Sequence, residues 1–264
     1  MMILLTGCVK EAGWSPDGAL PDVIVVDAIL TDEVKSHAVY LRYPSRELNT
    51  APEPVTGAAV VISNEDSVWQ LTESPAGSGH YLTPSWFSAK LQKSYTLIIY
   101  RNDRVYTATA SMVPALPFRE LSYLKDEASG LYYIDWVANA FDVADASMWE
   151  VLADWSHLPG YQEADSAKTH ARLLFYTLPT LDVSEIFAPQ MEKSLFPAGT
   201  IITERRYALH EKHAAFVREL LLETNWTGGL FGVMPANAGT NLSSGAIGYF
   251  AVCGVYELSL IVAP

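Results

Sequence analysis

Residues 94–110 read Ser94-Tyr95-Thr96-Leu97-Ile98-Ile99-Tyr100, then Arg101-Asn102-Asp103-Arg104, then Val105-Tyr106-Thr107-Ala108-Thr109-Ala110. The outer segments are rich in β-branched and aromatic residues, which is typical of strands, and the polar segment between them is typical of a turn. Two such segments around a short polar turn predict a β-hairpin. This hairpin indicates the fold class, because strand-like runs separated by turn residues also fill the chain before it.

Strand-like runs precede the hairpin at intervals of about ten residues, with turn residues between them. Roughly six or seven short strands at that spacing predict an immunoglobulin-like β-sandwich, which we place at residues 21–113. The Cys…Trp…Cys pattern of antibody domains does not occur in the sequence, so an antibody-type domain is not expected. The preceding runs are residues 23–30, 37–43, 55–62, 68–71 and 77–82.

The stretch after the hairpin is Val113-Pro114-Ala115-Leu116-Pro117-Phe118. Closely spaced prolines favour extended backbone and cannot donate to a sheet, so we expect a semi-rigid linker and a domain boundary here. Residues 119–264 then predict a second β-rich domain. Its expected strands are residues 131–141, 147–155, 171–177, 199–207 and 247–262, the first two being neighbours joined by a turn at 142–146 and the last interrupted by Gly254.

One α-helix is expected in this second domain, near residues 210–224. Ala214, Val217, Leu220 and Leu221 recur at helical rather than alternating spacing. Gly228-Gly229 is expected to end the helix. The fold prediction is therefore a mainly β protein, with an N-terminal immunoglobulin-like sandwich and a second β-rich domain that holds one helix.

Composition limits the classes of partner. The chain has 264 residues, half of them hydrophobic, which is enough for one large or two ordinary domains with a substantial core and excludes a disordered protein. Its formal net charge is −13. An acidic body is repelled by phosphate backbones and anionic lipid surfaces, so nucleic acid is not an expected partner. Cationic ligands and basic protein surfaces remain open as partners.

The N-terminus carries a possible lipid-attachment motif. Leu5-Thr6-Gly7-Cys8 follows the apolar run 1–4 and precedes a polar, Gly/Pro-containing stretch. This order predicts the remnant of a lipoprotein signal peptide at residues 1–7, a diacylglycerol on Cys8, and a tether over residues 8–20. The basic and longer apolar regions of a signal are missing, so the precursor is expected to start further upstream. The alternative is an ordinary apolar N-terminus with a buried cysteine.

The chain has one other cysteine, Cys253. A lipidated Cys8 cannot join a disulfide, so Cys253 is expected to be unpaired. It lies within residues 248–256, whose composition is that of a strand packed on both faces, and we expect a buried, unreactive thiol. No segment reaches the roughly 18 consecutive apolar residues of a transmembrane helix, and the expected attachment to a membrane is the lipid on Cys8.

Motifs spread over the chain point to one protein family. The C-terminal third has Phe216-Val217-Arg218-Glu219-Leu220-Leu221, Gly229-Leu230-Phe231, Pro235-Ala236-Asn237-Ala238-Gly239-Thr240-Asn241-Leu242 and Gly245-Ala246-Ile247-Gly248-Tyr249-Phe250. The N-terminal half has Cys8, Val25-Val26-Asp27-Ala28, Val55-Thr56-Gly57-Ala58-Ala59-Val60, and Tyr95-Thr96-Leu97 before Tyr106. Over nearly the whole chain this pattern resembles the Bacteroidota envelope lipoproteins grouped as a domain of unknown function, number 4249. Ala236-Asn237-Ala238-Gly239 departs from the clearer Pro-Gly-Asn-Ile turn of that family.

The resemblance implies an outer-membrane lipoprotein, often encoded near TonB-dependent transporters. It implies no established enzymatic role and brings no catalytic, cofactor or metal-binding residues to this chain. The shared motifs are turns and packing residues, which identify a fold more than an activity.

His210-Glu211-Lys212-His213 is the cluster closest to a metal-binding motif. Zinc proteases separate two histidines by four residues, so that both project from one face of a helix. Here the separation is three and a third ligand is not evident, so we expect exposed, solvated histidines. No metal and no cofactor are predicted.

Asp135, Asp142, Asp145, Glu150 and Asp154 could supply the facing carboxylate pair of a glycosidase. Acidic residues beside a turn are more often turn formers and solvated strand faces, and we favour that interpretation. No catalytic residue is assigned.

Trp136, Trp149 and Trp155 are the remaining candidates for ligand or partner contacts. They fall on two expected neighbouring strands, where exposed rings could stack on sugars or anchor a protein interface. Large aromatic residues also dominate buried area in β-sandwiches, so a core position is the favoured alternative.

These observations lead to three alternative hypotheses for the function. The leading hypothesis is a lipid-anchored outer-membrane protein that acts as a non-enzymatic binding or accessory protein, partnered with a TonB-dependent transporter or its cargo. The alternative is a surface module that binds carbohydrate or peptide for nutrient capture. The third, a hydrolase built on the Asp135–Asp154 carboxylates, is the least favoured.

Overall fold

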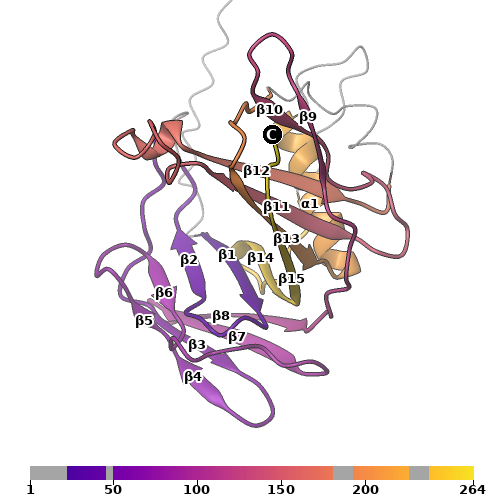
Figure 1. The fold of residues 1–264 in the computed structure, drawn as a ribbon. Helices are drawn as coiled ribbons and strands as arrows, with labels where there is room; N and C mark the ends of the chain where they lie inside the picture. The colour runs from indigo at the N-terminus through magenta and orange to yellow at the C-terminus, as the bar shows by residue number, and fades with distance from the viewer. Residues whose placement is uncertain (1–22, 46–49, 181–192, 226–237) are drawn as a thin grey trace, which may run out of the picture.

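The computed structural model describes residues 23–45, 50–180, 193–225 and 238–264. The expected signal remnant, the tether, Cys8 and Gly228-Gly229 lie outside these residues. The described chain forms β-sheets with one α-helix, and Figure 1 shows a β-sandwich below a second, four-stranded sheet. The prediction of a mainly β protein with one helix is confirmed.

The sandwich is built from two sheets. The five-stranded sheet has the order β14-β1-β2-β6-β5, and the four-stranded sheet has the order β4-β3-β7-β8. Without β14, these orders are the A-B-E-D and C′-C-F-G orders of an immunoglobulin sandwich, which confirms the predicted architecture. The strands are β1 (Ile24–Thr31), β2 (Ala38–Arg42), β3 (Ala59–Ser63), β4 (Val68–Gln70), β5 (Thr72–Glu73), β6 (His80–Leu82), β7 (Ser94–Arg101), β8 (Arg104–Ser111) and β14 (Ala246–Cys253).

The predicted hairpin is β7 and β8. Arg101 pairs with Arg104, so the loop consists of Asn102 and Asp103, both at positive φ (47° and 59°). Two central residues at positive φ define the turn whose twist matches that of the flanking strands, and Asn and Asp tolerate that conformation. Alternate residues of β7 enter the core of the sandwich, namely Tyr95, Leu97 and Ile99, each fully buried.

Tyr95 also fixes the loop before β7. Its hydroxyl oxygen accepts a hydrogen bond from the backbone N–H of Lys90 at 2.8 Å, while its ring is fully buried. A tyrosine near the start of strand F that bonds to the backbone a few residues upstream is the tyrosine corner of immunoglobulin-like folds. The sandwich therefore shares this local feature as well as the strand order.

β14 corrects the predicted division of the chain. Although β14 falls within residues 119–264, it pairs in parallel with β1, from Ile24 opposite Ala246 to Thr31 opposite Cys253. The outer edge of β1 needs hydrogen-bond partners, and a strand from the far end of the chain supplies them. The expected strand 247–262 is thus two strands, β14 in the sandwich and β15 (Val255–Ile261) in the second sheet, separated at Gly254.

The second part of the molecule has a four-stranded antiparallel sheet, in the order β12-β11-β13-β15, and a β9–β10 hairpin. The expected neighbours 131–141 and 147–155 are not neighbours: β10 pairs with β9, and β11 lies between β12 and β13. Both edges of β11 are therefore already used. The strands are β9 (Ser122–Lys125), β10 (Tyr132–Trp136), β11 (Ser147–Asp154), β12 (His170–Thr177) and β13 (Ile201–Ala208), with a short 3-10 helix at Ser166–Lys168.

The helix α1 (Glu211–Asn225) confirms the predicted helix. Ala214 and Val217 are three residues apart, a spacing that places both on one side of a helix. Both are buried on the inner face of α1, where they pack with Leu178 and Leu209. α1 lies beside the second sheet in Figure 1.

The expected linker 113–118 is fastened to both parts. The N–H of Val113 donates to the carbonyl of Val252 at 3.3 Å, and the N–H of Gly254 donates to the carbonyl of Val113 at 2.6 Å. The Arg206 guanidinium donates to the carbonyl of Leu116 at 2.8 Å. A side chain at position 254 would come within 2.5 Å of the backbone nitrogen of Ala115, so only glycine permits this close approach.

Candidate functional site

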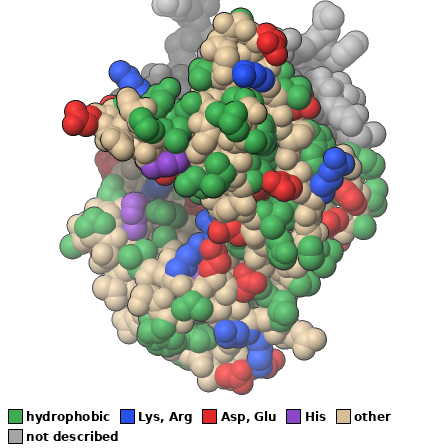
Figure 2. Space-filling model, in the orientation of Figure 1, with side chains coloured by type: hydrophobic (Ala, Val, Ile, Leu, Met, Phe, Trp, Pro, Cys, Tyr) green, Lys and Arg blue, Asp and Glu red, His purple; other side chains and the backbone are tan. Residues whose placement is uncertain are grey.

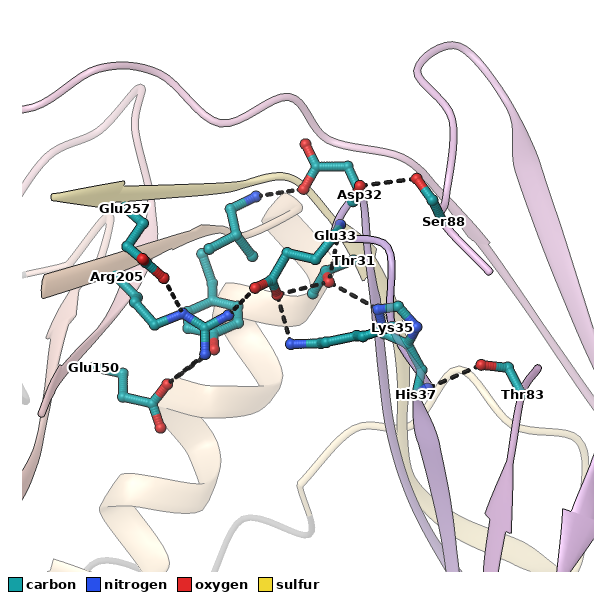
Figure 3. Close-up of polar contacts among 12 residues, drawn as sticks. Thr31, Asp32, Glu33, Lys35, His37, Thr83, Ser88, Glu150, Arg205 and Glu257 are labelled. Carbon is teal, nitrogen blue, oxygen red and sulfur yellow. Dashed lines mark hydrogen bonds and ion pairs between the residues drawn. The ribbon is translucent and has the colours of Figure 1, made fainter. Parts of the chain in front are cut away.

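Arg205 is the centre of a polar network between the two parts of the molecule. It projects from β13 and forms ion pairs with Glu33 of the β1–β2 loop, Glu150 of β11 at 3.4 Å and Glu257 of β15 at 3.3 Å (Figure 3). Figure 2 shows acidic and basic side chains close together at the level where the two parts meet. The network joins a loop of the sandwich to three strands of one sheet.

Glu33 is the sandwich's contribution to this network. Burial opposes its charge, but hydrogen bonds from Lys35 at 2.6 Å and Thr31 at 2.9 Å, with the nearby Arg205 charge, hold the pKa of Glu33 below its ordinary value. The carboxylate is thus ionised at neutral pH. Asp32, next to it, accepts a hydrogen bond from the N–H of Val255 at 2.9 Å. The β1–β2 loop therefore serves to hold the second sheet in place.

The acidic residues of the 135–154 region have structural partners. Glu150 accepts from Arg172 at 2.6 Å and from the hydroxyl of Tyr207 at 2.9 Å, in addition to its pair with Arg205. Engaged in this way, Glu150 is not a free general acid or base. Among the others, Asp135 is exposed, Asp142 accepts from the N–H groups of Ala144 and Asp145, Asp145 pairs with Arg206, and Asp154 accepts from Ser156 and lies 3.3 Å from His170.

Trp149 and Trp155 do not lie on a surface. Their exposed fractions are 6% and 7%, and both belong to the core of the second part. The indole N–H of Trp149 donates to the hydroxyl of Thr177 at 2.9 Å, and the rings of Trp149 and Phe118 form a T-shaped pair with their centres 4.8 Å apart. Their assignment as ligand contacts is wrong for this structure, and the core alternative holds for both.

Trp136 differs from the other two, because it is only half-buried. It borders a hollow of about 140 Å³ whose walls also include Tyr133, Phe175 and Lys193. The ammonium group of Lys193 lies 3.8 Å from the centre of the Tyr133 ring, and the guanidinium of Arg119 lies 5.6 Å from the Trp136 ring. Aromatic rings next to cations at a surface hollow form a candidate binding site.

A second hollow lies at the start of α1, and one of the residues that line it, His213, differs from its predicted exposure. It measures about 220 Å³, and His210, Lys212 and His213 line it. The expectation of a solvated side chain is wrong for His213, which is 6% exposed and stacks on Tyr249 with ring centres 4.6 Å apart. Burial, followed by the nearby His210, lowers the pKa of His213 to about 4. Position 213 lies four residues before Val217, which places it on the inner face of α1.

The described part of the chain contains no group of three or more His, Cys, Asp or Glu side chains arranged to hold a metal ion. Cys253 is 1% exposed and unpaired, as expected, and burial raises the pKa of its thiol to about 12. Cys8 lies outside the described residues.

Sequence reasoning did not find the buried charges of β13. Glu204, Arg205 and Arg206 are consecutive, and alternation along a strand places Arg205 on the face opposite the other two. Glu204 and Arg206 are 1% and 2% exposed. Three consecutive charged residues inside an apolar strand were the available signal, since charged side chains are seldom buried without a partner.

Together, these features define a class of protein: an immunoglobulin-like sandwich joined by polar contacts to a second β-sheet, with small hollows bordered by aromatic and basic side chains. The chain belongs to the family described as a domain of unknown function (DUF4249), whose model matches residues 16–157, more than half of the 264 residues. The match confirms the resemblance to this family over residues 16–157. A search of curated proteins found no match to the chain. None of the described helices has the length and apolar character needed to span a membrane.

Proposed function

We propose that this chain is a lipid-anchored protein of the bacterial outer membrane that acts by binding rather than by catalysis. Leu5-Thr6-Gly7-Cys8 carries the proposal, because it combines small residues and a thiol in the order that lipid attachment requires. Residues 9–23 separate Cys8 from the first strand, β1. A spacer of that kind lets a folded body stand clear of the lipid surface.

Cys8→Ala tests the anchor. Expressed from a full-length precursor, the unchanged chain is expected in the membrane fraction, with a mass increase on the peptide that contains Cys8. The variant is expected to lose the added mass and to leave the membrane, because two or three acyl chains contribute about 0.8 kcal/mol of partitioning per buried methylene. Cys253→Ala is the control, and it should keep both the added mass on the Cys8 peptide and the location in the membrane fraction. Unmodified Cys8, or a Cys8→Ala protein that stays in the membrane, would contradict the proposal.

The expected partner is an outer-membrane protein, in particular a TonB-dependent transporter. Support for a non-enzymatic role comes from Glu150, Asp145 and Asp154, whose carboxylates are engaged by basic side chains or hydroxyl groups. The test is purification from membranes solubilised in a mild detergent. A transporter is expected to co-purify in a stoichiometric amount; recovery of the protein alone under these conditions would count against the partnership.

A second candidate function is capture of a carbohydrate or peptide at the hollow beside Trp136. Tyr133 and Phe175 form its aromatic walls, and such rings can stack on sugars or peptide side chains. Trp136→Ala should abolish binding in a glycan and peptide screen. Trp86→Ala is the matched control, since Trp86 is 66% exposed and lies in the sandwich. Equal binding by both variants would dismiss this site.

A further inference from the structure

The outer edge of β12 carries backbone groups that point away from its sheet. β12 is the terminal strand of the sheet and pairs with β11. Backbone hydrogen bonds alternate along an antiparallel pair, and the N–H of Trp155 donates to the carbonyl of Thr169 at 3.0 Å, so every second residue of β12 from Ala171 onward bonds to β11. The N–H and C=O groups of the residues between these point outward. The outward residues are His170, Arg172, Leu174 and Tyr176.

This edge is open along residues 170–176. Along the described chain, no hydrogen bond joins the backbone of the outward residues to another segment. The next outward residue, Leu178, is bonded: its N–H donates to the carbonyl of Ala140 at 3.0 Å, and its carbonyl accepts from the N–H of Asp142 at 3.1 Å. A short backbone segment therefore already lies on this edge, just beyond the end of β12. The open length measures about 20 Å, and its row of donors and acceptors is complementary to one more β-strand.

The hollow that Trp136 borders lies beside this edge. Of the four strands of the sheet, β12 alone contributes to its described walls, through Leu173 and Phe175. The opposite wall is formed by residues 133–137 together with Lys193 and Ser194. Because side chains alternate between the two faces of a sheet, a strand added to β12 places every second side chain next to Leu173 and Phe175, at the hollow.

The hollow also limits which side chain fits. Its volume of about 140 Å³ is close to the roughly 150 Å³ of a protein cavity that holds benzene. Tyr133 and Trp136 give it aromatic walls, so it suits one aromatic or branched apolar side chain. On the other face of the sheet the added strand lies next to Arg172, whose side chain is 63% exposed and favours a carboxylate.

We propose that β12 binds an extended peptide segment of a partner protein as an added β-strand, with one aromatic or branched apolar side chain in the hollow beside Trp136. The inference rests on the proposed capture of a peptide at that hollow and names how the peptide is held. Hydrogen bonds to the outward backbone groups of Arg172 and Leu174 supply affinity for an extended chain, and the hollow selects the side chain. A carbohydrate in the same hollow offers no strand backbone and leaves the edge unused.

The probe is the peptide Thr-Val-Glu-Phe-Glu-Val-Thr, acetylated and amidated at its ends. Its valine and phenylalanine side chains share one face, and its glutamates face Arg172. Titration calorimetry with the full chain should detect binding at micromolar to millimolar concentration. Replacing the phenylalanine of the peptide by alanine should weaken binding about tenfold or more, because the hollow is then left unfilled.

Leu174→Pro tests the edge. Proline is tolerated on an edge strand where its nitrogen faces away from the sheet, so this change removes an outward N–H group and leaves the bonds to β11 in place. Peptide binding should weaken at least about tenfold. Leu174→Thr keeps the N–H group and should bind clearly more tightly than the proline variant.

Gln70→Pro is the matched control, at an exposed position of β4, the edge strand of the sandwich. The neighbouring Leu71 donates its N–H to the carbonyl of Val60 at 2.9 Å, so the N–H of Gln70 points away from β3. This variant should bind the peptide as the unchanged protein does. Equal weakening by Gln70→Pro and Leu174→Pro would show that the loss is not specific to β12.

Amide hydrogen exchange followed by NMR gives a second readout that needs no variant. Bound peptide should slow exchange at Arg172, Leu174 and Tyr176. Binding that is lost in Trp136→Ala but unchanged in Leu174→Pro, without slower exchange at these amides, would overturn strand addition and leave capture at the hollow standing. Failure of the peptide to bind at millimolar concentration would overturn the inference, whereas a glycan that binds in the separate screen would still support the hollow as a site.

Discussion

Glu204 is a carboxyl group inside the second part of the molecule. It is 1% exposed; one oxygen accepts the N–H of Leu121 at 3.0 Å, and the other, Oε1, has no partner. Burial raises the pKa of Glu204 to about 7, with a further contribution from the negative charge of Glu120 and despite the opposing hydrogen bond from Leu121. The group therefore exchanges its proton near neutral pH, unlike an ordinary glutamate.

The protonation of Glu204 predicts a pH dependence of stability. Between pH 4.5 and about 7 the folded state holds this proton and the unfolded state does not, so the free energy of unfolding should fall as pH rises through that range. Glu204→Gln keeps an acceptor for Leu121 and should remove the dependence, stabilising the protein by about 2 kcal/mol at pH 8. Urea unfolding at several pH values measures this. Glu127→Gln, on an exposed turn, should leave the pH dependence of the free energy of unfolding unchanged. If this free energy falls with pH as steeply in Glu204→Gln as in the unchanged protein, the expectation is refuted.

Among the secondary-structure elements, the parallel pair β1–β14 depends on one glycine. Gly248 has φ of 98°, and a Cβ atom at this position would lie 2.0 Å from the carbonyl oxygen of Val26. Neither the backbone conformation nor the space admits a side chain. The pair can therefore form only with glycine at this position.

Gly248→Ala should lower the free energy of unfolding by about 3 kcal/mol or more, since strain and a backbone clash act together. Gly57→Ala is a suitable comparison: Gly57 also has positive φ, at 66°, but a Cβ atom there would have no other heavy atom within 4 Å. It should cost only about 1 kcal/mol. Denaturant titration distinguishes the two, and similar losses would show that close packing of β1 and β14 is not the cause.

The elements that the sequence predicted best are those specified by neighbouring residues. The β7–β8 hairpin follows from alternation around Asn102-Asp103, and α1 follows from apolar spacing over a few turns. The partner of β1 could not be predicted, because a parallel pair between the first and penultimate strands leaves no local period. Likewise, residues 142–146 are compatible with a hairpin turn between β10 and β11. The two edges of β11 pair instead with β12 and β13.

The binding sites are harder to predict than the elements. The sequence is enough to single out Trp136, yet Tyr133, Phe175 and Lys193 join it only through the fold. Arg205 is held by acidic groups from three separate segments, which no spacing along the chain reveals. Contacts between side chains of different strands can be predicted only once the strand order is known.

At the scale of the whole molecule, Arg205 connects the two parts. Its side chain is 14% exposed and that of Glu150 is 9% exposed, so loss of Arg205 leaves a poorly hydrated carboxylate with less compensation. Glu33 on the sandwich side loses a partner at the same time. One substitution is thus expected to weaken both the sheet and its join to the sandwich.

Arg205→Met should destabilise the protein by about 3 kcal/mol, as expected when one member of a buried pair is removed. Arg172→Met is the matched control, because Arg172 pairs with the same Glu150 but is 63% exposed, and its loss should cost less than about 1 kcal/mol. Hydrogen exchange read by mass spectrometry should show faster exchange in both β1 and β13 of the first variant. Faster exchange confined to β13 would mean that the two parts are energetically independent.

The parallel pair of β1 and β14 also bears on how the protein is made. A ribosome releases β1 long before Ala246–Cys253, so the nascent chain carries an open sheet edge while the residues between them are made. Contacts between such distant residues slow folding, and an unpaired edge invites association with other chains. The native pairing of β1 is thus reached only after Ala246–Cys253 has been made, and until then the open edge of β1 is exposed to association with other chains.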